Sequence, residues 1–451
     1  MLLRLWAAGL AGWIGFVVLS SAPVTGSSRL RVPREVHAAG RGCCTSAETV
    51  IYRFRGDLDT GKGPDGIEPG TGLTADPSGD GVLYGTTAFG GKYRHGTVFK
   101  LTPSASGYTE SVVFSFPNSG HTGAGPSGAP VLVDFTGAIY STTGGGSGSN
   151  CGAVFKLTPT ASTYSLSVLH RFAVASDGCF TAYSGLYEDA SGALYGTTFA
   201  GGEGSCDSYP PHVQGCGTVF KLTPTASGKY GAKVLYRFEG GDDGWNPRAG
   251  VIEDASGALY GTTNSGGETK CNCGTVFKLT PAGGGTYTES LIHVFAMHDT
   301  PGKNPQGPLI ADSQGDFYGA AFNRSNGPSV VYELVPSPSM PGGYAFKVLF
   351  HFAGEEFTTS LVFCSRSGAI CATTLFGGSY EAGDAIELTP PQSSGGLYAE
   401  TVLYTFSPGN GGDYPTCCLV YAGGTLYGTT VAGGGPSDEI WGVAFKLSLP
   451  K

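Results

Sequence analysis

Acidic side chains recur in the longest connecting segments of this chain, and they are the residues best suited to chemistry. Carboxylates bind calcium, and a pair of them can hydrolyse a glycosidic bond. The residues that we assign to one candidate binding face, a tryptophan among them, are Asp57, Asp59, Asp177, Asp242, Asp243, Trp245 and Asp413. None of these acids belongs to a complete calcium-loop signature such as D-x-D-x-D-G. Calcium binding is therefore one hypothesis and solvated loop acids are the alternative; we predict no other metal and no cofactor.

Familiar catalytic motifs are absent from the sequence. It contains no H-E-x-x-H, no G-x-S-x-G and no phosphate-binding loop. His170 and His293 stand where other repeats carry Tyr or Phe, which favours a packing role for both. These observations favour a non-catalytic module that binds a polysaccharide or a protein. The alternative is a polysaccharide-active hydrolase or lyase that uses acids of the same face.

The elements that must position these acids follow from a repeat of five residues, Leu-Tyr-Gly-Thr-Thr. It occurs in seven copies or close variants, and the gaps between their second residues are 56, 55, 65, 58, 53 and 56 residues. The copies lie at residues 83–87, 139–143, 194–198, 259–263, 317–321, 370–374 and 426–430. A period of this size is typical of propellers and related repeat arrays.

Each repeat contains four short runs that we interpret as strands. The third, such as Gly-Thr-Val-Phe-Lys-Leu-Thr-Pro, and the fourth, such as Val-Leu-Tyr-Arg-Phe, do not alternate cleanly, which is typical of strands covered on both faces. The longest link follows the fourth run, so each blade runs from centre to rim. We therefore predict an all-β, seven-bladed β-propeller with four strands per blade. The blades are expected at about residues 71–116, 127–172, 184–238, 249–295, 307–352, 359–406 and 417–449.

One predicted strand is displaced along the sequence. The seventh blade lacks a fourth run, but residues 48–54 closely match residues 400–406 of the sixth. We predict that residues 46–54 complete the last blade and close the ring, which removes the two exposed edges of an open array. Because strand direction alternates within a blade, the loops after the second and fourth strands emerge on one face. That face carries the variable, acid-rich loops, and binding is typical of such loops.

The repeat units at residues 194–224 and 259–281 resemble the Gloeo/Verruco, or GloVer, tandem repeat of secreted bacterial proteins. The resemblance covers nearly all of the chain after residue 45. It implies a propeller-like fold and an extracellular or envelope location, and it supplies no catalytic residues. Proteins with that repeat often carry a C-terminal sorting anchor, but this sequence ends without an apolar tail, so we expect no such anchor.

Twelve cysteines, an even number, favour disulfides in an oxidising compartment over thiolate metal sites. Cys206 and Cys216 share the longest second-to-third loop, so we predict a local disulfide between them. Cys151 and Cys179 emerge on one face from neighbouring blades and form a second candidate pair. Cys364 and Cys371 flank a hairpin turn, and the type of that turn decides whether they face each other.

The N-terminus is typical of an export signal. A basic start, an apolar stretch over residues 5–19 and a small, polar exit predict a signal peptide over residues 1–26, followed by a leader segment over residues 27–45. An uncleaved anchor is the alternative, although a spanning helix needs about 20 apolar residues. The net charge of −9 offers no basic footprint for nucleic acid. We expect a monomer that is secreted, periplasmic or held in the cell envelope, with no membrane span after signal removal.

Overall fold

The structure is a computed structural model of the 451-residue chain. The residues that it describes are 46–56, 62–117, 125–126, 128–144, 151–181, 185–208, 213–268, 270–296, 302–323, 328–353, 358, 360–365, 367–393, 395–407, 409, 411–416, 418–434 and 440–449. The predicted signal peptide and leader segment, residues 1–45, lie outside the described residues.

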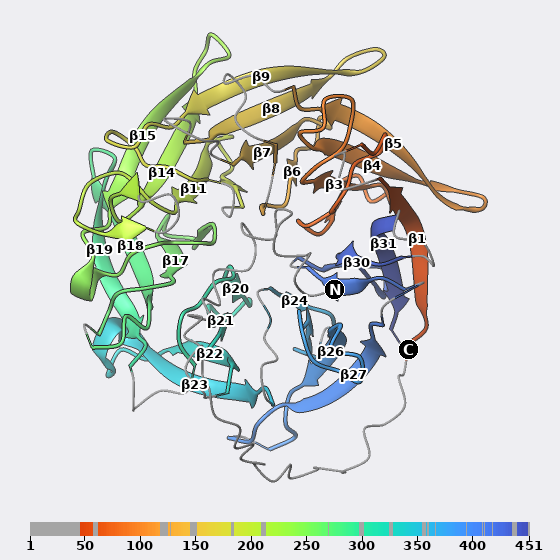
Figure 1. Ribbon diagram of the computed structural model, residues 1–451. Helices are drawn as coiled ribbons and strands as arrows, with labels where there is room; N and C mark the ends of the chain where they lie inside the picture. The colour runs from red at the N-terminus through yellow and green to blue at the C-terminus, as the bar shows by residue number, and fades with distance from the viewer. Residues whose placement is uncertain are drawn as a thin grey trace, which may run out of the picture.

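Seven β-sheets stand in a ring around a common centre (Figure 1). The innermost strands, from blade 1 to blade 7, are β2 (Thr74–Ala75), β6 (Leu132–Val133), β10 (Tyr187–Glu188), β16 (Ile252–Glu253), β20 (Ile310–Ala311), β24 (Leu361–Phe363) and β29 (Val420–Ala422). The second strands are β3 (Leu83–Thr87), β7 (Ile139–Thr143), β11 (Leu194–Thr198), β17 (Leu259–Thr263), β21 (Phe317–Ala321), β25 (Ile370–Thr373) and β30 (Thr425–Ala432).

The outer half of each blade is longer than the inner half. The third strands are β4 (Thr97–Ser104), β8 (Ala153–Pro159), β14 (Thr218–Pro224), β18 (Thr275–Gly283), β22 (Val330–Pro336), β26 (Asp384–Thr389) and β31 (Ile440–Ser448). The fourth strands of blades 1 to 6 are β5 (Gly107–Ser115), β9 (Tyr164–Arg171), β15 (Tyr230–Arg237), β19 (Thr286–Val294), β23 (Tyr344–His351) and β27 (Ala399–Thr405). All pairings within the blades are antiparallel, so the predicted seven-bladed, all-β propeller is confirmed.

The strand that closes the ring comes from the other end of the chain. β1 (Glu48–Arg55) pairs antiparallel with β31, with Glu48 opposite Leu447 and Arg55 opposite Ile440. β1 is therefore the fourth strand of blade 7, as the sequence predicts. In Figure 1 it lies at the rim beside β31, next to the first blade.

The glycine of Leu-Tyr-Gly-Thr-Thr makes room for an aromatic ring on the third strand. Gly261 of β17 lies opposite Phe277 of β18, and a Cβ at position 261 would stand 2.5 Å from the Phe277 ring. Gly85 has the same relation to Phe99, at 2.4 Å. The second strands β3, β7, β11, β17 and β21 are buried along their whole length. The repeat therefore encodes tight packing between the second and third strands.

The hydrophobic core lies between neighbouring blades. At most junctions the aromatic residue after a fourth strand packs against an aromatic residue of the next blade's third strand, for example edge-on in Phe116 on Phe155 and Phe238 on Phe277. At the junction of blades 5 and 6, Phe352 packs in one cluster with Ile386 instead. Phe54, at the end of β1, packs edge-on against Phe99 of blade 1. This contact shows that the N-terminal strand fills the position of a fourth strand in packing as well as in pairing.

Five elements of the described residues lie outside the predicted four-strand scheme. A small hairpin, β12 (Asp207–Ser208) and β13 (Val213–Gln214), stands in the long loop of blade 3, and β28 (Asp413–Pro415) adds to β30 in blade 7. Two short 3-10 helices, η2 (Gly241–Asp243) and η3 (Pro341–Gly343), complete the structure. Within the described residues, no helix has the length and hydropathy needed to cross a membrane.

Candidate functional site

Two acids of the predicted binding face hold the segments in which they lie. The carboxylate of Asp177 lies 2.5 Å from Nε2 of His170 and accepts the backbone N–H of Ala173. The carboxylate of Asp243 accepts the hydroxyl of Tyr236 at 2.7 Å. Burial opposes ionisation of Asp177, but the hydrogen bonds to its carboxylate outweigh burial and lower its pKa; burial raises the pKa of Asp243. Both acids therefore tie a linker between blades to the fourth strand that precedes it.

The other residues predicted for the binding face lie in separate segments. Asp242 is exposed in η2, whereas Trp245 is half-buried and its backbone pairs with that of Ser265. Asp413 lies in β28, and burial raises its pKa to about 6. Asp57 and Asp59 lie outside the described residues. No group of three His, Cys, Asp or Glu side chains in the described part of the chain is arranged to hold a metal ion, and calcium binding remains a prediction.

The repeated Asp that follows the innermost strand in blades 1 to 5 is part of the turn. Oδ1 of Asp189 accepts the N–H groups of Ser191 and Ala193, and Oδ2 accepts the hydroxyl of Tyr195 at 2.9 Å. Although burial tends to raise it, these bonds lower the pKa of Asp189 to about 2. The same hydroxyl contact recurs at Asp76, Asp134, Asp254 and Asp312. These carboxylates are therefore already engaged in hydrogen bonds within the blades.

The repeated Thr pair is likewise used within the fold. The hydroxyl of Thr197 donates to the carbonyl of Ala249, in the linker that leads into the next blade. The hydroxyl of Thr198 bonds that of Thr218 and accepts its N–H. Both threonines are buried, so their hydroxyls join strands and blades and do not form a ligand ring.

Four disulfides are present among the described residues: Cys151–Cys179, Cys206–Cys216, Cys271–Cys273 and Cys364–Cys371. Cys206–Cys216 closes the long loop of blade 3, and Cys151–Cys179 joins the start of blade 2's third strand to the linker that enters blade 3. Cys271–Cys273 joins the two ends of the C-x-C sequence, a pairing that the sequence analysis did not propose. Cys418 is also in a disulfide. The first three bonds clamp loops on the face where the linkers arrive, whereas Cys364–Cys371 spans the turn between the first and second strands of blade 6, at the opposite face.

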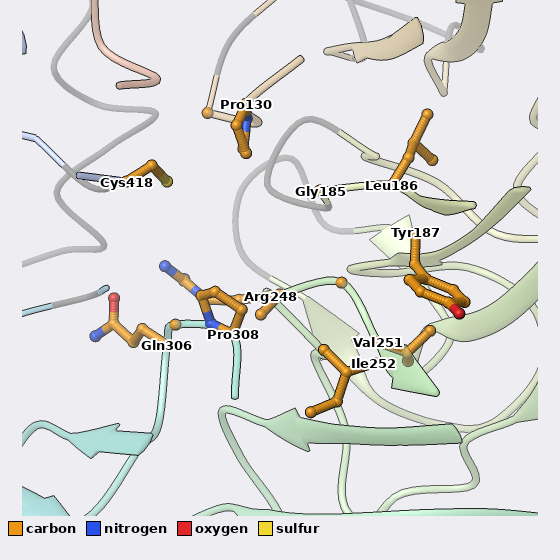
Figure 2. A pocket seen from close by; sticks show the side chains of 14 residues that line it. Pro130, Gly185, Leu186, Tyr187, Arg248, Val251, Ile252, Gln306, Pro308 and Cys418 are labelled. Atoms are coloured by element: carbon orange, nitrogen blue, oxygen red, sulfur yellow. The ribbon is translucent and has the colours of Figure 1, made fainter. Parts of the chain in front are cut away.

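A cavity of about 270 Å³ lies where these linkers reach the innermost strands (Figure 2). We call it the central cavity. Its walls come from blades 2, 3, 4, 5 and 7, and most of its surface is apolar, with Pro130, Leu186, Val251 and Pro308 among its residues. Among the described residues, the lining contains no Asp and no Glu. Because the innermost strands begin at the face where the fourth-strand linkers emerge, the cavity belongs to the predicted binding face.

Two linkers enter the cavity through the same short sequence, Asn-Pro-x. Asn246 and Asn304 are left-handed, with φ of 55° and 48°, a conformation that Asn tolerates better than most residues. Their backbone N–H groups donate to the carbonyl oxygens of Cys216 and Cys273. Each of these cysteines precedes a left-handed glycine, which stands directly before the third strand of the preceding blade. A Cβ on either glycine would lie 2.7 or 2.8 Å from the Cδ atom of the linker proline. Glycine and proline thus lock the linker onto the preceding blade.

The residue at position x in these two linkers is Arg248 in blade 4 and Gln306 in blade 5. The Arg248 guanidinium lies 5.0 Å from the centre of the Phe199 ring, and the Phe199 carbonyl accepts a 2.8 Å hydrogen bond from Nδ2 of Asn246. Tyr187, a third polar residue of the lining, donates its hydroxyl to Glu253 at 3.0 Å. Burial, then the neighbouring Glu253, raises the pKa of Tyr187 to about 12. Tyr187 is therefore neutral at physiological pH and is engaged with Glu253.

A model of the Gloeobacter/Verrucomicrobia repeat matches residues 41–208 and again residues 208–361, which together are more than half of the chain. The chain belongs to this family. The resemblance predicted from the sequence is thereby confirmed. No curated protein matches the chain.

Solved structures similar to this Gloeobacter/Verrucomicrobia repeat protein are propellers of low sequence identity. One is the extracellular domain of a putative one component system from B. thetaiotaomicron, with a TM-score of 0.50 and 10% identity over 88% of this chain and 40% of that one. Another is a polysaccharide lyase, an ulvan lyase bound to a GlcA(1-4)Rha3S unit, with a TM-score of 0.50 and 10% identity over 88% and 95% of the two chains. The chain spans about two fifths of the first structure's length. At such identity the likeness shows the fold alone.

Sequence reasoning on this repeat protein missed Arg248, Gln306 and Tyr187. It concentrated on acids because carboxylates are the residues that usually bind ions and cleave sugars. A signal was nevertheless present, since the third residue of Asn-Pro-x stands four residues before Ile252 and Ile310, where two innermost strands begin. Unlike residues at one fixed position of a repeat are a better indication of a site than the repeated residues themselves.

Proposed function

We propose that this protein binds a ligand in the central cavity and does not turn it over. The observation that carries the proposal is the Asn-Pro-x scaffold, which holds unlike polar side chains, Arg248 and Gln306, at the edge of a cavity with apolar walls. Ligand sites are typically apolar hollows with a few well-placed polar groups. The disulfides support a role outside the cytoplasm, in the envelope or the extracellular space.

A polysaccharide hydrolase or lyase is the rival function. A glycosidase needs two carboxyl groups about 5–10 Å apart, and no Asp or Glu lines the central cavity in the described part of the chain. A lyase needs a base, and Tyr187, the hydroxyl of the lining, is bonded to Glu253 with its pKa raised to about 12. The similar fold of a polysaccharide lyase makes polysaccharides the first ligands to test.

Filling the cavity tests the proposal. Gly185 lines the cavity with an ordinary φ, and the nearest atom to a Cβ at this position would be Cγ of Pro130, at 3.7 Å. Gly185→Phe should therefore occupy the cavity without straining the backbone. Gly231→Phe is the matched control, because Gly231 is exposed in β15 and a Cβ there would meet no atom closer than 4.0 Å.

The measurement is calorimetric binding of a panel of acidic and neutral polysaccharides, with release of reducing or unsaturated ends followed in parallel. We expect at least one polymer to bind the natural protein and the Gly231→Phe variant, and to lose about tenfold or more in affinity for Gly185→Phe. Binding that survives Gly185→Phe would place the ligand elsewhere. Product release would support the rival enzyme.

A further inference from the structure

The two residues that the Asn-Pro-x linkers present to the central cavity differ from the rest of its lining. Arg248 is the one charged side chain among the described residues that line it, and Gln306 brings an amide from the neighbouring blade. We infer that the central cavity takes a carboxylate, held by the Arg248 guanidinium and the Gln306 amide. This inference rests on the proposed binding function and names the chemical class of its ligand.

The two groups occupy equivalent positions of neighbouring blades. Both stand four residues before the start of an innermost strand, at Ile252 or Ile310, and both follow a proline docked on the preceding blade. Figure 2 shows the guanidinium of Arg248 and the amide of Gln306 reaching toward the side where Cys418 lies. Neighbouring blades thus each contribute an N–H donor to the lining of the central cavity.

Arg248 is held in place before any ligand arrives. Its guanidinium lies over the ring of Phe199, which is buried at the end of the second strand of blade 3. The Asn246 side chain bonds the carbonyl of that same residue, so the linker and the ring are fixed together. A donor that is already oriented loses less conformational entropy on binding.

Charge at the cavity is opposite in sign to that of the molecule. The chain has a net charge of −9, yet the described lining of the central cavity carries one guanidinium and no carboxylate. The turn acids, from Asp76 to Asp312, lie at the far ends of the innermost strands and are bonded there to tyrosine hydroxyls. An anion is therefore the charged group that the cavity favours.

A carboxylate fits these donors because the guanidinium is planar and offers two parallel N–H groups to a planar acceptor. The apolar walls add contacts for the body that carries the acid. Pro130, Leu186 and Val251 can lie against the apolar face of a sugar ring. A uronic acid combines both features, as a free sugar or as a unit of a polymer.

Calorimetry with polygalacturonate, its carboxyl-reduced neutral form and free galacturonate tests the inference. We expect the acidic polymer to bind, and Arg248→Gln to weaken binding about tenfold or more, since a charged hydrogen bond is lost. Arg248→Lys, which keeps the charge without the planar fork, should recover only part of the affinity, and Gln306→Ala should also bind more weakly. Binding of free galacturonate to the natural protein, weakened by the same variants, would show that one acid suffices; binding of the polymer alone would show that flanking units contribute.

Lys303→Gln is the matched control. Lys303 stands in the same linker as Gln306, does not line the cavity, and its loss changes the net charge equally. Equal weakening by Lys303→Gln and Arg248→Gln would overturn the inference in favour of general electrostatics. Equal affinity for the carboxyl-reduced polymer, lost in Gly185→Phe, would also overturn it while leaving the proposed binding function intact. No binding of any ligand by the natural protein would refute both, and an unchanged melting temperature in each variant shows that folding is not the cause.

Discussion

At two blade junctions a partly buried glutamate lies beside a second acid, and its ionisation is therefore unfavourable. Glu289 of β19 lies close to Asp243, which is bonded to Tyr236 of the preceding blade, and Glu110 of β5 stands in the same relation to Asp65 and Tyr52. Burial, and then the neighbouring acid, raises the pKa of each glutamate to about 7. One buried oxygen of each has no hydrogen-bond partner among the described residues.

Replacing Glu289 should therefore alter the pH dependence of stability. The pKa of Glu289 is raised from 4.5 to about 7 in the folded protein, so the unfolded chain releases its proton first as pH rises. Stability contributed by the protonated carboxyl is present below pH 4.5 and is lost as pH rises toward 7. Glu289→Gln should match the natural protein at pH 4.5 and exceed its stability at pH 8 by about 1 kcal/mol, a modest value because solvent screens a half-buried group.

Urea unfolding at the two pH values checks this expectation. Asp242→Asn serves as the control, because Asp242 is an exposed acid of the linker that carries Asp243. The control should show the same small effect at both pH values. A stabilisation by Glu289→Gln that is equal at pH 4.5 and pH 8 would contradict a raised pKa.

At the scale of elements, the pairing of second and third strands depends on residue size. Gly261 faces Phe277, whereas in blade 6 Ala372 faces the smaller Ile386. Blade 2 departs from this rule, since Ser141 lies opposite Phe155 and its buried hydroxyl has no partner among the described residues. The side chain on the third strand therefore determines what the second strand can carry.

Gly261→Ala should destabilise the protein by about 1–3 kcal/mol, because the added methyl group would overlap the Phe277 ring. Gly231→Ala is the matched control. Gly231 also lies in a strand with an ordinary φ, but its Cβ would meet no atom closer than 4.0 Å. That variant should be neutral or slightly more stable, since alanine restricts the unfolded chain. Equal losses in both variants, measured by chemical denaturation, would show that ring overlap is not the cause.

Most of the strands could be predicted from the sequence. Periodic runs identified the four strands of each blade, because buried strands and tight turns leave a regular pattern of residue types. β28 and the β12–β13 hairpin left no such pattern, because each occurs in a single blade and is not repeated around the ring. The linkers also lack periodicity, and the direction of Arg248 depends on a left-handed Asn and a docked proline. A pattern of polarity does not encode those features, so the central cavity was not predicted.

At the scale of the whole molecule, β1 joins the two ends of the propeller. Its loss would leave β31 as an unpaired edge and would remove Phe54, which is fully buried, together with Ile51. A chain that begins at residue 62 should therefore be about 3–6 kcal/mol less stable than one that begins at Ser46, from the lost burial of two large side chains. It should also self-associate through the open edge.

Thermal melting and sedimentation of the two chains test this. The chain from Ser46 keeps β1 and should remain monomeric with the stability of the natural protein. A peptide of residues 46–56 added to the shorter chain should raise its melting temperature. Identical melting and sedimentation of the two chains would show that β1 adds nothing to the ring.

The closing strand also sets an order of events during synthesis. β1 leaves the ribosome before every other strand of the propeller, and its partner β31 leaves last. β1 cannot pair early, because its partner strand has not yet been made. Joining segments so far apart in the chain is also slow and costs the conformational entropy of a very large loop. The ring can close only after the whole domain has been made. A chain that stops before β31 would leave β1 unpaired, so pairing of the first strand requires that the last strand has been made.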